Sequence, residues 1–268
     1  MKRNKIQAVF LCLCVVLLYC LSARMGQHSE FINAEALDNV DLDNVEVDEP
    51  ADDWVMPTPE PTPTPTPTPY VDPDLPDISI GEWNYKLIDN VHVLPNTFTP
   101  PEVVELDNYQ FIDSRIQQPL EDMLAGAREA GYDVCVRTGY RPYASQAVVF
   151  FGRASTIAEN KGIGNAEAEM IARQYVAYPG TSEHQYGLSA DIMDSLTTTM
   201  SAEDVEDLPV LLWLKEHCAE YGFILRYPKD KQNITGWYEP WHFRYVGTDA
   251  AEYIMDKGIC LEEFIEKY

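Results

Sequence analysis

Residues 112–138 read IDSRIQQPLEDMLAGAREAGYDVCVRT, and the hydrophobic period changes within them. In the first part, apolar side chains recur every three or four residues, as on one face of a helix, at Ile116, Leu120, Met123, Leu124 and Ala127. Gly131 is typical of a helix end. After it the period becomes two, with Tyr132, Val134 and Val136 on one side, which predicts a strand. The segment therefore predicts a helix that runs almost directly into a strand.

The chain continues beyond this segment in the same mixed manner, and no internal repeat appears. Hydrophobic periods and turn residues predict helices over 145–160, 166–175, 209–221 and 250–255, and strands over 188–193, 223–227 and 243–246. These helices and strands interleave without the regular βαβ rhythm of a doubly wound sheet. The sequence therefore predicts one compact α+β domain over residues 80–268.

Residues 1–26 have the pattern of an export signal, a basic start followed by an uncharged apolar run. As a helix, the run would be roughly 27 Å long, enough to span the hydrocarbon core of a bilayer. Because the residues after it make a poor cleavage site, we expect a retained anchor, with cleavage and secretion as the alternative. Either outcome places the rest of the chain outside the cytoplasm, in contact with the membrane through this segment only.

Residues 27–79 are expected to form a disordered linker. The stretch 27–56 is acidic and lacks Lys and Arg, so it cannot offset its ordering entropy by burial. Residues 57–69 read PTPEPTPTPTPTP, which favours an extended polyproline II spacer. Such a linker would give the domain reach away from a membrane.

The composition narrows the class of partner. The chain has 44 Asp and Glu against 19 Lys and Arg, a formal net charge of −25, which argues against nucleic-acid binding because that needs a basic surface. Three of the six cysteines lie within residues 1–26, so too few remain for a disulfide scaffold.

The first segment with chemical content is PGTSEHQYGLSADIM, residues 179–193. His184 precedes the strand predicted there, and Asp191 lies on it. A carboxylate within an apolar strand is costly unless it is paired or bound to a cation. When this segment is considered alone, an ion pair with an arginine explains Asp191 equally well.

A second segment, GWYEPWHFRYVG at residues 236–247, adds Glu239 and His242. Pro240 argues against a helical metal motif, so we expect a turn that enters a strand. Taken alone, such an aromatic turn is more often part of a core. Together with His184 and Asp191, however, His242 completes two imidazoles and one carboxylate, a set typical of catalytic zinc with an open fourth position. Glu239 would then be free to act as a base.

A third segment, VRTGYRPYASQ at residues 136–146, contains Arg141 in a strand-to-helix turn, where an arginine can project over a cleft. Without further information, a surface arginine or the structural partner of an acid is the more common explanation.

The three segments together resemble the motifs of the VanY-type D-alanyl-D-alanine carboxypeptidases, zinc peptidases of the bacterial cell wall. The matching positions follow the family's order and comprise 138–141, Gln146, Ser182, His184, Gly187, Ser189, Asp191 and 239–247. Two positions depart from the pattern, since Pro142 stands in place of a serine and Ser189 in place of an alanine. Neither departure concerns a metal ligand. The resemblance implies a compact zinc-peptidase fold similar to that of the Hedgehog signalling domain.

The resemblance also implies roles for individual residues. It implies that Zn²⁺ is bound by His184, Asp191 and His242. Glu239 corresponds to the catalytic base, and Arg141 to the arginine that stabilises negative charge on the scissile carbonyl. Ser182 and Gln146 match positions that contact the substrate.

The function expected from this resemblance is hydrolysis of the C-terminal peptide bond of peptidoglycan stem peptides. An L,D-carboxypeptidase or an endopeptidase acting on the same stems is an alternative, because this metal site would serve any of these bonds. A non-enzymatic alternative is a wall-binding module with a structural zinc. Glu239 argues against that module, because a structural site has no need of a base beside an open metal position.

Overall fold

The computed structural model describes residues 72–198 and 201–268, all of which belong to one compact unit, Pro67–Tyr268. The predicted export segment, residues 1–26, and most of the predicted linker lie outside the described residues. Within the described part of the chain, no helix is both long and apolar enough to cross a bilayer.

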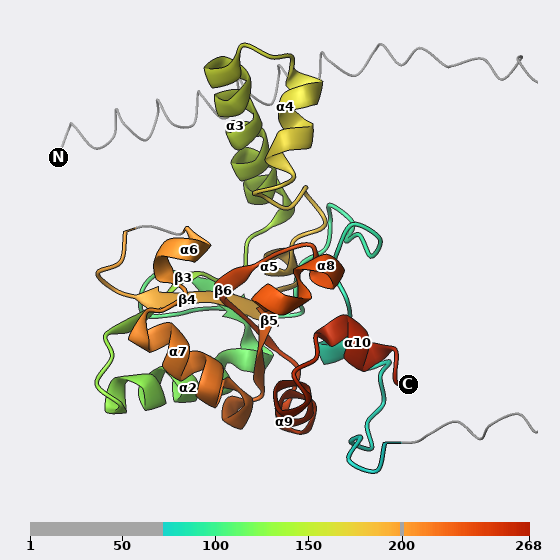
Figure 1. Cartoon of the computed structure of the whole chain (residues 1–268), viewed down its shortest axis with the longest axis vertical. Coiled ribbons are helices and arrows are strands. Elements are labelled where there is room, and N and C mark those ends of the chain that lie inside the picture. The colour runs from blue at the N-terminus through green and yellow to red at the C-terminus, as the bar shows by residue number, and fades with distance from the viewer. Residues whose placement is uncertain (1–71, 199–200) are drawn as a thin grey trace, which may run out of the picture. The chain divides into compact units, whose positions relative to one another are not determined.

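The centre of the unit is a four-stranded sheet with the strand order β3-β4-β6-β5, in which every neighbouring pair is antiparallel (Figure 1). The strands are β3 (Val134–Thr138), β4 (Ser189–Asp194), β5 (Phe223–Tyr227) and β6 (Glu239–Tyr245). Along the chain, helices lie between these antiparallel strands, as expected for an α+β domain. The predicted fold class is confirmed.

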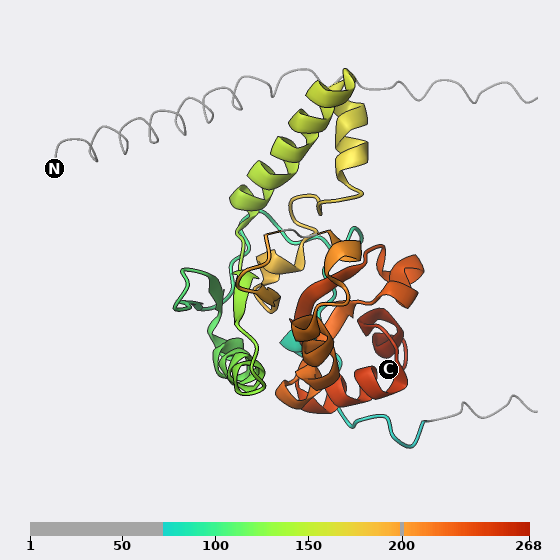
Figure 2. The same ribbon diagram turned by 60° about the vertical axis from the view of Figure 1, so that its left-hand side comes forward.

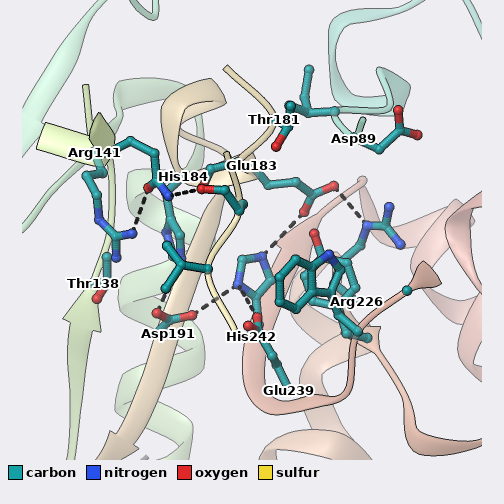
Figure 3. A pocket seen from close by; sticks show the side chains of 18 of the residues that line it. Asp89, Thr138, Arg141, Thr181, Glu183, His184, Asp191, Arg226, Glu239 and His242 are labelled. Carbon is teal, nitrogen blue, oxygen red and sulfur yellow. Dashed lines mark hydrogen bonds and ion pairs between the residues drawn. The ribbon is translucent and has the colours of Figure 1, made fainter. Parts of the chain in front are cut away.

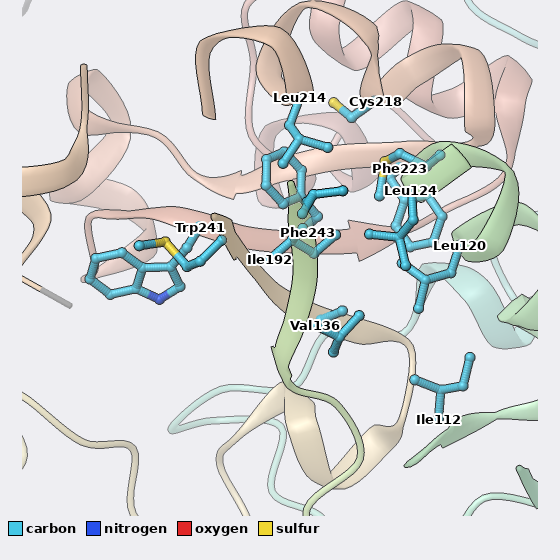
Figure 4. Close-up of a cluster of buried hydrophobic side chains, with 14 of the residues drawn as sticks. Ile112, Leu120, Leu124, Val136, Ile192, Leu214, Cys218, Phe223, Trp241 and Phe243 are labelled. Atoms are coloured by element: carbon cyan, nitrogen blue, oxygen red, sulfur yellow. The ribbon is translucent and has the colours of Figure 1, made fainter. Parts of the chain in front are cut away.

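One side of the sheet carries an apolar layer, formed with α2 (Gln117–Glu129) and α7 (Pro209–His217) (Figure 4). Its fully buried members include Leu120, Ile192, Leu214, Phe223 and Phe243. Burial of one such side chain stabilises the fold by roughly 1.5–3 kcal/mol relative to exposure. This layer is the main hydrophobic core of the unit.

The opposite side of the same strands is polar near the middle of the sheet. Neighbouring residues of a strand point to opposite sides, and the register places Asp191 opposite His242, and Ser189 opposite Arg244. The one-turn helix α5 (Glu183–Tyr186) covers this polar face. It was not predicted, because four residues cannot show a helical period.

A second, smaller core lies around β5, against α9 (Thr248–Lys257) and α10 (Leu261–Ile265). Its buried members include Ile224, Val246, Ala250, Ile254, Leu261 and Phe264. The first described residues of the chain, 72–74, contact α9 of this second core as well. The Tyr253 hydroxyl donates a hydrogen bond to Asp72 Oδ2 at 2.6 Å, and Lys257 Nζ lies 2.8 Å from Asp74 Oδ2. Asp72 and Asp74 both come before residue 80, where the domain was predicted to begin. Whether the domain starts at residue 80 stays a prediction.

A helical hairpin of α3 (Tyr143–Lys161) and α4 (Asn165–Ala172) projects from the rest of the unit (Figures 1 and 2). The two helices share a small core of their own, formed by Phe150, Ala154, Ile157, Ala168 and Ala172. Gly162 ends α3 with a φ of 64°, a conformation that favours glycine.

The remaining elements are short and escaped prediction for that reason. They are β1 (Val103–Glu105), β2 (Phe111–Asp113), α6 (Ala202–Val205), α8 (Gln232–Thr235) and the 3₁₀ turns Trp83–Tyr85, Ser114–Ile116 and Lys229–Lys231. The helix predicted over 209–221 is α7 followed by a further 3₁₀ turn, Cys218–Tyr221.

The start of β6 differs from the expectation, because this strand begins at Glu239 rather than at residue 243. Pro240 lies beyond the last pair with β4, Asp191 with His242, and faces an irregularity in β5 between Leu225 and Tyr227. A proline at such a position removes no regular ladder hydrogen bond. Glu239 and His242 are therefore held by a strand instead of a turn.

Candidate active site

A cavity of about 400 Å³ opens above the polar face of the sheet (Figure 3). The seven predicted site residues all line it, namely Arg141, Gln146, Ser182, His184, Asp191, Glu239 and His242. They come from five different parts of the chain: the loop after β3, the start of α3, α5 with the residue before it, β4 and β6.

Three of these residues form a candidate metal site. His184, Asp191 and His242 each offer one ligand atom, and these atoms lie within 4.8 Å of one another. His184 Nε2 is 3.2 Å from Asp191 Oδ2, and His242 Nδ1 is 3.0 Å from Asp191 Oδ1. All three residues are buried, so the cluster is shielded from bulk water.

The second nitrogen of each imidazole has a partner on the side away from the cluster. His184 Nδ1 lies 2.9 Å from the carbonyl oxygen of Gly139, and His242 Nε2 lies 3.4 Å from Glu183 Oε2. Because both partners can only accept, these nitrogens donate. When a metal takes the place of the proton on His242, both imidazoles are neutral and turn a lone pair toward the cluster, as metal ligation requires.

The charges of the cluster are unevenly distributed. Burial lowers the pKa of His184, and the neighbouring Asp191 opposes this only in part. Burial also disfavours a charge on His242, but hydrogen bonds with Asp191 and Glu183 outweigh it and raise the pKa of His242 to about 9. Burial would likewise raise the pKa of Asp191, but the two histidines hold it far below its usual value. The cluster thus stabilises positive charge, which a divalent cation can supply in place of a proton.

Glu239 lies beside this cluster without belonging to its core. Its Oε2 is 3.5 Å from His242 Nδ1, and its side chain is 25% exposed, against 8% or less for the three cluster residues. Burial raises the pKa of Glu239 to about 7, and His242 only partly counteracts that rise. A carboxyl group that titrates near neutrality can both take and return a proton.

Arg141 is held over the cavity by the loop 139–141. Its backbone N–H donates to the carbonyl oxygen of His184 at 2.9 Å, and its Nη1 donates to Gln146 Oε1 at 2.8 Å. The loop passes so close to β2 that a Cβ on Gly139 would lie 2.1 Å from the carbonyl oxygen of Phe111. Only glycine fits at that position. Burial lowers the pKa of Arg141, while Asp191 and Glu239 favour its charged form.

Gln146 and Ser182 complete the predicted set. The Gln146 side chain is 1% exposed and bridges Arg141 to the carbonyl oxygen of Ala177, to which it donates at 2.7 Å. Ser182 is 5% exposed and directly precedes α5, at the wall of the cavity. Gln146 therefore supports Arg141 as well as lining the space beside it.

Sequence reasoning missed three charged residues next to the cluster, two of which, Glu183 and Arg226, also line the cavity. Glu183, Arg226 and Arg244 are at most 1% exposed. Burial would raise the pKa of Glu183, but the two arginines hold it far below its usual value. A signal that could have revealed the two arginines is their position within the apolar strand sequences FILRY and PWHFRY. No local signal marks Glu183.

Comparison with known families gives a direct match. A model of the D-alanyl-D-alanine carboxypeptidase family VanY matches residues 109–248. A D-alanyl-D-alanine carboxypeptidase of Enterococcus faecalis is 39% identical over 186 residues, which is 69% of this chain and 66% of that protein. The matched part thus spans slightly less than two thirds of that relative.

Solved structures agree with this match. The vancomycin resistance D,D-pentapeptidase VanY, in a variant complexed with Zn(II), has a TM-score of 0.60 and 38% identity, over 69% of this chain and 99% of that one. The L,D-carboxypeptidase LdcB has a TM-score of 0.58 and 33% identity, over 68% of this chain and 85% of that one.

Proposed function

Because the chain belongs to the VanY family of D-alanyl-D-alanine carboxypeptidases, we propose that it is a zinc carboxypeptidase that removes the C-terminal residue of peptidoglycan stem peptides. The observation that carries the proposal is the cavity, where a buried set of three metal-binding side chains meets a separate carboxylate, Glu239, with a pKa raised to about 7. A structural zinc site would need only the first part of this arrangement.

The donor set suits zinc. His184, Asp191 and His242 would hold it through two neutral imidazole nitrogens and one carboxylate oxygen, the composition of a catalytic zinc site. Zn²⁺ bound there supplies a Lewis acid that polarises a carbonyl group and acidifies water.

Glu239 would act as the general base and then as the general acid. It takes a proton from the attacking water and returns it to the leaving amine, so that the terminal residue departs as a free amino acid. Its partial exposure supports this role, because the group has to reach both water and substrate in the cavity.

Arg141 would stabilise the negative charge that grows on the carbonyl oxygen during attack. Its support from Gln146 and from the backbone of His184 holds the guanidinium group in place before the substrate arrives. Ser182 and the remaining surface of Gln146 would contact the substrate, because both line the same cavity.

The place of action follows from the substrate. Peptidoglycan lies outside the cytoplasmic membrane, and the export pattern of residues 1–26 fits that location. We infer that this segment provides any contact with the membrane, either as a retained anchor or as a leader that is removed.

An L,D-carboxypeptidase is the second candidate. It is favoured by one observation, that the likeness to LdcB, with a TM-score of 0.58, is almost as close as the likeness to the D,D-enzyme, with 0.60. The two activities differ in the bond cut, which a direct assay separates.

Mass spectrometry of defined stem peptides after incubation with the purified protein tests the proposal. A D,D-carboxypeptidase shortens a pentapeptide stem by one D-alanine and leaves a tetrapeptide stem intact, whereas an L,D-carboxypeptidase shortens the tetrapeptide. Chelation of the metal should abolish either reaction, and added Zn²⁺ should restore it. Intact stems of both lengths, in the presence of bound zinc, would contradict the proposal and favour the wall-binding module.

A further inference from the structure

Glu183 is a fully buried carboxylate in the wall of the same cavity, next to His242 of the candidate metal site (Figure 3). Its Oε1 accepts hydrogen bonds from Arg226 Nε at 2.8 Å and from Arg244 Nη1 at 2.7 Å. Its Oε2 faces His242 Nε2 at 3.4 Å. One carboxylate oxygen of Glu183 thus contacts the two arginines, and the other contacts the imidazole of His242.

The arginines are themselves held from behind. Arg226 donates two hydrogen bonds to Glu262 of α10, at 2.9 and 2.7 Å. Arg244 donates to the carbonyl oxygens of Asn84 at 3.2 Å and Lys86 at 2.9 Å. Because each guanidinium group is fixed on both sides, the Glu183 carboxylate has little freedom to turn.

The two histidines of the cluster differ in the partner of the ring nitrogen that points away from the cluster. His184 donates its outer N–H to a neutral backbone carbonyl, whereas His242 faces a carboxylate. A carboxylate partner orients an imidazole ligand and raises its basicity more than a neutral acceptor does. A buried ion pair that served only the fold would not need a carboxylate oxygen directed at a ligand.

We propose that Glu183 is a positioning residue that fixes the tautomer and ring orientation of His242, so that Nδ1 is presented to the metal. The inference rests on the proposed function, in which His242 is a zinc ligand. Glu183 touches neither the metal nor the substrate in this account and acts only through His242.

The test uses the full chain loaded with Co²⁺, whose absorption spectrum reports the ligand geometry. Glu183→Gln removes the charge that His242 faces, and Glu183→Asp keeps the charge for the arginines but shortens its reach. Each variant should weaken Co²⁺ and Zn²⁺ binding by roughly 10–100-fold in chelator competition, the usual effect of losing such a partner. Each should also change the Co²⁺ spectrum.

Asp113→Asn is the matched control. Asp113 is equally buried and accepts from Arg115 Nε at 2.9 Å, but it contacts none of the three cluster residues. Its loss should lower thermal stability and leave metal affinity and spectrum unchanged.

Two results would overturn the inference. If Glu183→Gln fails to fold, a folded Glu183→Asp with wild-type affinity and spectrum is sufficient to reject it. An equal loss of affinity in Asp113→Asn would show that the effect is general destabilisation. A wild-type chain that binds no metal would reject the proposed function as well, which separates the two failures.

Discussion

The two faces of the central sheet are built from the same strands and both bury side chains, yet they carry opposite chemistry. In β4 and β6 a step of one residue leads from Ile192 to Asp191 and from Phe243 to His242. The apolar layer stabilises the fold by removing hydrocarbon from water, whereas each charge on the polar face costs free energy unless it is paired. We therefore expect that changes on one side of the sheet affect stability and changes on the other affect activity.

The largest effect is expected from Glu239→Gln on the polar face. This change keeps the shape of the side chain but removes its ability to take a proton, so kcat should fall by roughly 10²–10⁴-fold. Zinc content, measured by atomic spectroscopy, should stay at the wild-type level. Asp191→Asn is the contrasting variant, since it alters a candidate ligand and should lose both metal and activity. Loss of zinc from Glu239→Gln would instead make Glu239 a ligand.

Arg141→Ala should have the next largest effect. Removal of a donor that acts only when charge develops in the transition state should lower kcat by roughly 10²–10³-fold with zinc still bound. Arg128→Ala is the control, because this exposed arginine of α2 lies outside the cavity and its side chain donates a hydrogen bond to the carbonyl oxygen of Val134. A normal kcat for Arg141→Ala would return Arg141 to a purely structural role.

Leu214→Ala tests the apolar layer. Leu214 is fully buried on α7, so its truncation should lower the free energy of unfolding by about 2–5 kcal/mol. Chemical denaturation measures this loss, and kcat well below the melting temperature should match the wild type. A kcat that falls together with stability would break the separation between the two faces.

The smallest effect is expected from Tyr253→Phe, which concerns neither face. The variant removes the hydrogen bond to Asp72 and should lower the melting temperature by roughly 2–4 °C, corresponding to about 1 kcal/mol. Tyr109→Phe is the control, because Tyr109 is 81% exposed and its hydroxyl makes no hydrogen bond to the described residues. An unchanged melting temperature for Tyr253→Phe would favour the predicted domain start at residue 80 over an earlier one.

The sequence supports prediction where a pattern is long or a motif is dense. The helix period around Leu120 and Leu124 spans several turns, and it predicted α2 within a few residues of its ends. The motif segments indicated the family and seven residues that prove to line the cavity, although the roles of those residues stay predictions. Both kinds of signal are local, so neighbouring residues suffice to reveal them.

The remainder depends on contacts between distant segments. Glu183 meets Arg226 across 43 residues and Arg244 across 61, and no local period reports such a meeting. Its position next to His184 was visible, but its burial was not. The strand start at Glu239 was missed for a related reason. Pro240 is tolerated in β6 only because of the register in which β6 pairs with β4 and with β5, which lie elsewhere in the chain.

The order β3-β4-β6-β5 has a consequence for the time at which the molecule becomes complete during synthesis. The strand that is made last occupies an inner position, and β4 and β5 are joined only through it. Until residue 245 has been added, a growing chain can therefore pair β3 with β4 but leaves β5 without a partner strand, and such late, long-range pairing slows folding. His242 arrives with the same strand, so the last step that closes the sheet also delivers the final member of the metal-binding set.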